Sequence, residues 1–122
     1  MKKLAFLIAA TLLGAAPALA QTVCVEPAPP AMVDGSTASR EALVAAVAQV
    51  KNFRDKSDVY QQCIADDLDA KKAAAAKAGT PFDEQIHQVA MAKVAANQQL
   101  KDKLVADINT QVGLYKQKTA AK

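Results

Sequence analysis

Between Ser36 and Ala78 the chain contains neither glycine nor proline, and its apolar residues recur at intervals of three and four. Such spacing places apolar side chains along one face of a helix. The hydroxyl groups of Ser36, Thr37 and Ser39 are available as N-caps at its start. The pattern predicts a helix over about 38–78. Its apolar or permissive face consists of Leu43, Val47, Val50, Phe53, Ser57, Tyr60, Ile64 and Leu68.

The sequence Gly79-Thr80-Pro81 ends this helix and starts another. Glycine is favoured just after a helix, threonine as an N-cap and proline at the first helical position. We therefore expect Thr80 to cap a second helix over about 81–118. Its predicted face consists of Phe82, Ile86, Val89, Ala92 or Lys93, Ala96, Leu100, Leu104, Ile108, Val112 and Tyr115.

A connection this short makes the two helices antiparallel neighbours. Counting outward from Gly79 pairs Tyr60 with Leu100. The predicted fold class is all-α, a long, coiled-coil-like antiparallel hairpin over residues 37–122. The heptad-like spacing also allows self-association, although alanines in the stripe would equally permit close packing within one hairpin. The residues expected in the core or in such an interface are Val47, Phe53, Tyr60, Ile64, Leu100, Leu104, Ile108 and Tyr115.

Residues 1–20 have the organisation of a secretory signal peptide. Lys2 and Lys3 precede an apolar stretch, and Ala18-Leu19-Ala20 provides small residues for cleavage after Ala20. Removing this segment lowers Lys plus Arg from 15 to 13, against 12 Asp plus Glu. This near-neutral balance, with the two signs alternating, argues against nucleic-acid binding. No later run approaches the roughly 20 apolar residues of a transmembrane span.

Export to an oxidising compartment makes one disulfide the simplest interpretation of Cys24 and Cys63. Two free thiols or an intermolecular bridge are the alternatives. The bridge would close a loop of about 40 residues, which corresponds to roughly 3 to 4 kcal/mol in the chain-entropy model. Val23, directly before Cys24, is not the small residue that precedes an acylated cysteine, so we expect no lipid anchor.

Residues 21–36 contain three prolines followed by Asp34-Gly35. This composition disfavours helix and favours an extended arm that ends in a turn. Polyproline-like backbone from Cys24 to Thr37 spans about 40 Å, and helix from Thr37 to Cys63 spans about 39 Å. The arm is therefore expected to fold back along the first helix to a disulfide. It should place four side chains on the hairpin, those of Val23, Val25, Met32 and Val33.

The chain offers little for catalysis. Its serines have no neighbouring base, its cysteines are expected to be oxidised, and it has no glycine-rich phosphate loop. We expect no catalytic residue and no cofactor. The weak metal candidates are Asp83, Glu84 and His87, which share one helix surface. Zinc normally takes three or four protein ligands, and a solvated helix face is the more common role of such a group.

One combination of features spans residues 24–68: Cys24, Pro27, Pro30, Asp34-Gly35, Thr37-Ala38-Ser39, and a long Ala-rich helix with Tyr60 and Cys63. It resembles a group of small exported proteins of Gram-negative bacteria that have no assigned function. The resemblance implies a periplasmic location and a helical build. It supplies no catalytic or binding residues.

Together these features predict a non-enzymatic periplasmic hairpin that acts through its surface as an interaction, scaffold or holdase-like module. Its expected partner is another protein or a second copy of itself. Two alternatives come from other classes. One is a metal-responsive protein that uses Asp83, Glu84 and His87. The other is an inhibitor of a secreted or cell-wall enzyme, which small size and a disulfide would suit.

Overall fold

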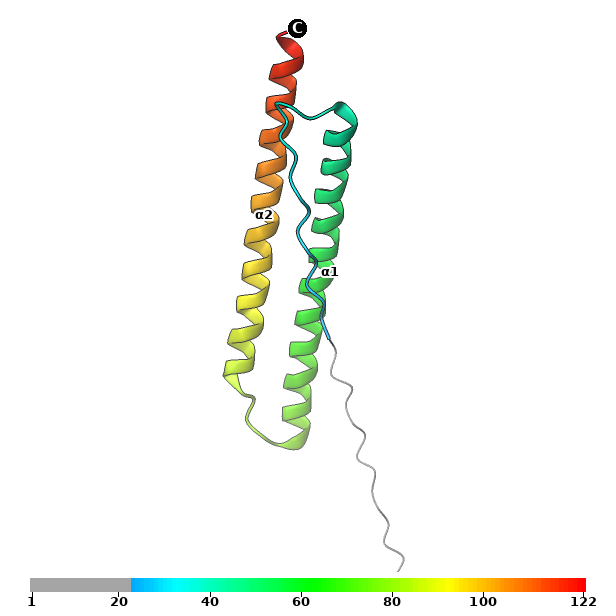
Figure 1. The fold of residues 1–122 in the computed structure, drawn as a ribbon. Coiled ribbons are helices and arrows are strands. Elements are labelled where there is room, and N and C mark those ends of the chain that lie inside the picture. Colours follow the sequence, from blue (N-terminus) through cyan, green and yellow to red (C-terminus); the bar gives the residue numbers. More distant parts are fainter. Residues whose placement is uncertain (1–22) are drawn as a thin grey trace, which may run out of the picture.

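The computed structural model describes residues 23–122 as two long antiparallel helices with an extended arm beside them (Figure 1). Helix α1 spans Arg40–Ala78 and α2 spans Glu84–Ala120. The predicted all-α hairpin is confirmed. No helix within the described range is long and apolar enough to cross a membrane. The predicted signal peptide and its cleavage after Ala20 lie outside the described residues.

The helix ends show why the chain turns where it does. Ser39 caps α1, because its hydroxyl accepts from the Ala42 N–H at 3.1 Å. Gly79 ends α1 in the left-handed region with φ 68°, where glycine carries no steric penalty. The predicted Thr80 cap is wrong. The Thr80 N–H and hydroxyl both bond back to the Ala75 carbonyl, at 3.0 and 3.4 Å, so this residue completes α1.

Asp83 is the residue that caps α2, and the helix therefore starts three residues later than predicted, at Glu84. The Asp83 carboxylate accepts from the Gln85 N–H at 2.9 Å. Pro81 consequently lies in the link between the helices and not at the first helical position. A carboxylate at this site also suits the positive end of the helix dipole.

The buried core lies between the helices in the half of the hairpin away from the loop. It consists of Leu43, Ala46, Val50, Phe53, Leu104 and Ile108. Leu100 and Tyr115 are half-buried against it, and Tyr60 and Ile64 continue the buried stripe along α1. Val47, predicted for this stripe, is 42% exposed. Ala46 takes the buried position, since counting back by seven from Phe53 along the contact face reaches residue 46.

Polar contacts between the helices fix their register. Gln61 donates to Asn97 at 2.9 Å, and Lys101 pairs with Asp58. These contacts lie close to the predicted pairing of residues 60 and 100. The side chain of Lys101 on α2 is largely buried, and its ammonium group contacts the Asp58 carboxylate of α1. Arg54, four residues before Asp58 on α1, instead reaches Asp55 at 3.5 Å.

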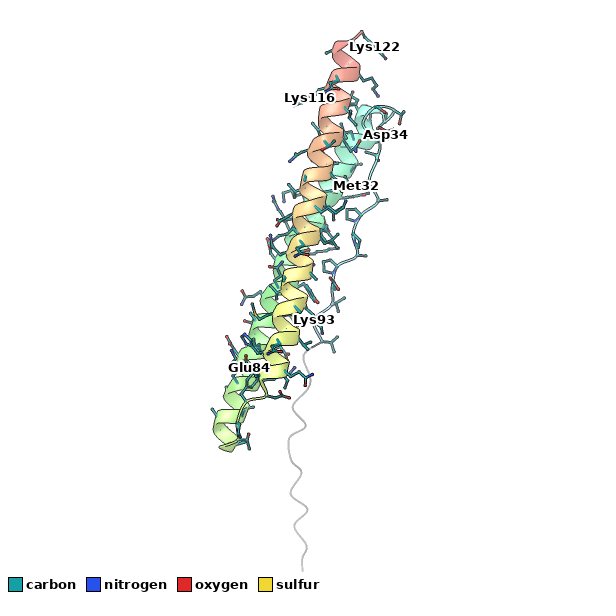
Figure 2. The ribbon with its side chains drawn as sticks, turned by 90° about the vertical axis from the view of Figure 1, so that its left-hand side faces the viewer. Met32, Asp34, Glu84, Lys93, Lys116 and Lys122 are labelled. Carbon is teal, nitrogen blue, oxygen red and sulfur yellow. A yellow bond between two sulfur atoms is a disulfide. The ribbon has the colours of Figure 1, made fainter. Side chains whose placement is uncertain are left out.

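The arm runs along the junction of α1 and α2 as a third layer (Figures 1 and 2). Met32 and Val33 pack against the core cluster, as predicted. Val23 and Val25 do not, and they remain 81% and 78% exposed. Polyproline-like backbone has three residues per turn, so every third side chain lies on the same side. Cys24, Pro27 and Pro30 are accordingly half-buried, and the residues between them are exposed. Since Cys24 faces α1 to form its disulfide, both of its neighbours face solvent.

The turn that joins the arm to α1 is anchored on α2. The N–H groups of Thr37 and Ala38 donate to the Asp34 carbonyl, at 3.1 and 2.8 Å. The buried Gly35 donates its N–H to Oε1 of Gln111 at 2.8 Å. A Cβ at Gly35 would overlap the Gln111 carbonyl, so only glycine permits this close approach.

Candidate functional site

The hairpin has an open groove between α1 and α2 in the half nearer the loop, where the described part of the arm no longer covers it. Its volume is about 560 Å³. We call this surface the open groove. It is lined by Val23, Cys24, Tyr60, Ile64, Asp67, Leu68, Lys71, Asp83, Gln85, Ile86, Val89, Ala90 and Lys93. Figure 2 shows Lys93 and Glu84 toward this end of the molecule, away from Met32 and Asp34.

The two walls of the open groove differ in exposure. Ile64 and Leu68 on α1 are each only 7% exposed, whereas Ile86 and Val89 on α2 are 38% and 50% exposed. All four belong to the apolar faces predicted from the sequence. The prediction of apolar faces therefore holds here, but the α2 face is incompletely buried in this half. Isolated apolar residues are common on protein surfaces, whereas neighbouring ones that line a groove indicate a binding surface.

Charged side chains form the rim of the open groove. Lys71 pairs with Asp67 at 2.6 Å on α1. The Asp83 carboxylate is engaged in capping α2. Lys93 forms no ion pair with any of residues 23–122. The rim thus offers one cation that is free to meet an anion on a ligand.

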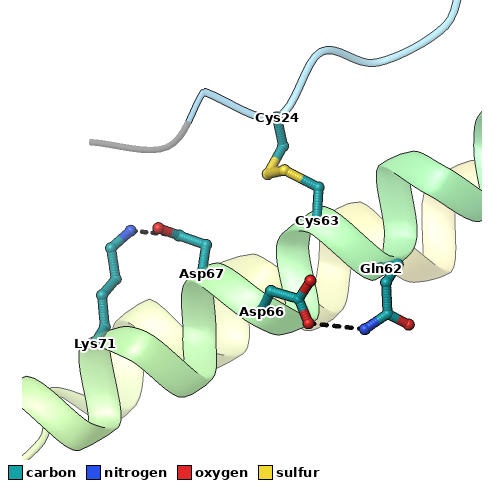
Figure 3. Close-up of a disulfide and its surroundings, with 6 residues drawn as sticks. All are labelled: Cys24, Gln62, Cys63, Asp66, Asp67 and Lys71. Carbon is teal, nitrogen blue, oxygen red and sulfur yellow. Dashed lines mark hydrogen bonds and ion pairs between the residues drawn. A yellow bond between two sulfur atoms is a disulfide. The ribbon is translucent and has the colours of Figure 1, made fainter. Parts of the chain in front are cut away.

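The predicted disulfide between Cys24 and Cys63 is confirmed, with a Cα–Cα distance of 5.7 Å (Figure 3). It fixes the arm to α1 at the upper end of the open groove, which Cys24 also lines. The sulfur that a lipid anchor would need on Cys24 is used in this bond. Figure 3 also shows Asp67 and Lys71 one and two turns along α1 from Cys63.

Tyr60 lies where the arm and the open groove meet. It is buried, and burial raises the pKa of its hydroxyl. The carboxylate of Glu26 on the arm raises this pKa further. The side chain is therefore a neutral phenol at physiological pH, and it contributes an aromatic surface to the groove wall.

Just above the open groove, the core contains a polar layer formed by Ser57, which belongs to the predicted face of α1, and by Asn97, which is not on the predicted face of α2. Ser57 and Asn97 are both 0% exposed. The Asn97 amide donates to Ser57 Oγ at 3.4 Å and accepts from Gln61 at 2.9 Å. The predicted face contains Ala96 instead, but Ala96 is exposed. Counting back by seven from Leu104 would have identified Asn97.

The three weak metal candidates have separate environments and do not form one site. Asp83 caps α2, Glu84 is exposed and His87 is half-buried. Among residues 23–122, no group of three or more His, Cys, Asp or Glu side chains is arranged to hold a metal ion. The geometry therefore adds no support to the metal-responsive alternative.

Comparison of the chain with known protein families, with curated proteins and with solved structures finds no match.

Proposed function

We propose that this chain is a non-enzymatic, periplasmic interaction module of holdase or scaffold type, and that its binding surface is the open groove. The observation that carries the proposal is the α2 wall, where Ile86 and Val89 are 38% and 50% exposed opposite the buried Ile64 and Leu68 of α1. Covering exposed apolar groups with a partner removes them from water and so favours binding.

The disulfide supports the proposed location. Disulfides persist in exported proteins and are rare in reducing compartments. The confirmed Cys24–Cys63 bond is therefore compatible with export. The location is tested by expressing the full chain in a Gram-negative host and measuring the mass of the periplasmic product. We expect a chain that begins at Gln21, whereas retention in the cytoplasm with Met1 intact would contradict the proposal.

The binding function is tested by light scattering from thermally unfolded citrate synthase in the presence of the exported, oxidised protein. We expect suppression of aggregation that is lost when both groove residues are charged, in the double variant Ile86→Asp/Val89→Asp. A matched control, Val59→Asp/Met91→Asp, adds the same charge at two exposed apolar positions outside the groove lining. Equal activity of the two double variants would contradict a role for the groove.

A further inference from the structure

The arm shows what kind of chain the hairpin surface accepts. It is an extended segment with prolines, and Pro27 and Pro30 lie in a hollow shared with Phe53 of α1. Further along, Met32 and Val33 pack on the core cluster. An extended, largely apolar chain is therefore already seated on the hairpin, from Gly35 beside α2 across to its disulfide on α1 (Figure 1).

The arm is seated without backbone pairing. Between Val23 and Val33 it forms no hydrogen bond with α1 or α2, and the first such contact is that of Gly35 with Gln111. Polyproline-type backbone keeps its polar groups solvated, so it can lie on a helical surface through its side chains alone. The surface thus selects apolar side chains on an extended backbone and has no need for a free N–H at each residue.

The open groove continues this seat beyond the end of the described arm. Val23 and Cys24 line its upper end. Its α1 wall consists of Tyr60, Ile64 and Leu68, which extend the same buried stripe that Phe53 belongs to. From Tyr60 to Lys71 the groove spans about 16 Å of helix, which matches about five residues of polyproline-like chain.

We propose that the open groove binds a short, extended, apolar segment of a partner polypeptide, in line with the arm and with a carboxylate directed at Lys93. This inference rests on the proposed function and names its ligand. Two features argue for it: continuity with the seat already occupied by the arm, and the ammonium group of Lys93, which forms no ion pair with residues 23–122 and lies beside the apolar wall of Ile86 and Val89.

The test uses fluorescence anisotropy with a labelled peptide, Val-Pro-Val-Glu-Val-Pro-Val, and the exported, oxidised protein. We expect binding that weakens at least about tenfold in Ile86→Asp/Val89→Asp, and less than about twofold in the control Val59→Asp/Met91→Asp; tenfold corresponds to about 1.4 kcal/mol. Far-UV circular dichroism establishes that both variants remain helical. Exchanging the peptide Glu for Gln should weaken binding to wild type but not to Lys93→Ala.

Three outcomes would overturn the inference. Binding that the groove variant leaves unchanged would place the peptide elsewhere. Binding only of an amphipathic helical peptide would show that the groove takes a helix. Sedimentation equilibrium that shows a dimer dissociated by Ile86→Asp/Val89→Asp would show that a second copy covers the groove. In the last two cases the proposed function stands if aggregation suppression still depends on the groove, so the two failures are distinguishable.

Discussion

In the half of the hairpin away from the loop, three layers meet: α1, α2 and the arm bury a cluster that includes Phe53 and Ile108. In the half near the loop, the described arm reaches only the upper end of the open groove, at Val23 and Cys24, and Ile86 and Val89 stay partly exposed. Each of two packed helices buries only the part of the other's apolar stripe that faces it. The third layer therefore completes the core, and where it ends the apolar α2 wall of the open groove is left partly exposed.

The largest expected change in stability comes from truncating one apolar side chain in each half. Phe53→Ala should lower the free energy of unfolding by about 3 to 5 kcal/mol, because it opens a cavity in the three-layer half. Ile86→Ala removes a 38% exposed side chain and should cost less than about 1 kcal/mol. Urea denaturation followed by circular dichroism measures both. Equal costs would mean that the two halves are equally well packed.

Loss of the disulfide tests how the third layer is held. Cys24→Ser/Cys63→Ser should cost on the order of 3 to 4 kcal/mol, because the bridge joins residues 39 positions apart. Since the arm has no hydrogen bonds to the helices between Val23 and Val33, the Met32 methyl resonance should shift toward its unfolded value. Reduced wild-type protein is the matched control. An unshifted Met32 in both would show that packing alone holds the arm.

The third largest loss of stability is expected from substitutions in the polar layer of Ser57 and Asn97, at the boundary of the two halves. Asn97→Ala leaves the fully buried Ser57 hydroxyl without its partner. Unsatisfied buried polar groups typically cost about 1 to 3 kcal/mol. Ser57→Ala/Asn97→Leu, in contrast, should regain much of this stability but weaken register specificity, because buried amides set register in coiled coils. Denaturation midpoints check the first effect, and cross-linking between the helices checks the second.

Much of this comparison was predictable from the sequence, since the 3–4 spacing indicates two faces, Gly79 marks their junction and the cysteine pair indicates the fold-back of the arm. The groove was not predictable. An apolar face has the same pattern whether or not a neighbour covers it, so the exposure of Ile86 and Val89 depends on where the arm ends. Val47 and Ala46 are adjacent and both fit the three-four spacing, and only the seven-residue step back from Phe53 favours Ala46.

A substitution at Gly35, in the turn between the arm and α1, tests the close approach of the arm to α2. Gly35→Ala should cost about 1 to 3 kcal/mol, because its Cβ would overlap the Gln111 carbonyl and the turn would have to move. Gly113→Ala, on α2 nearby in sequence, meets nothing within 4 Å and should stabilise by about 0.5 to 1 kcal/mol through helix propensity. Stabilisation by both substitutions would contradict the contact.

The smallest expected effect is a pH dependence confined to the arm-covered half. The Ser36 hydroxyl and N–H, at 2.6 and 2.9 Å from Asp34, hold the pKa of that carboxyl below its usual 3.8. A lowered folded-state pKa means that the contribution to stability is present above the unfolded-state pKa and is lost as the pH falls through the folded-state value. Ser36→Ala should therefore raise the Asp34 pKa toward 3.8. The pKa of Asp55, lowered chiefly by its hydrogen bond from Lys51 on α1, should not change. Carboxyl carbon shifts in an NMR titration measure both groups, and an unchanged Asp34 would show that Ser36 does not order the turn.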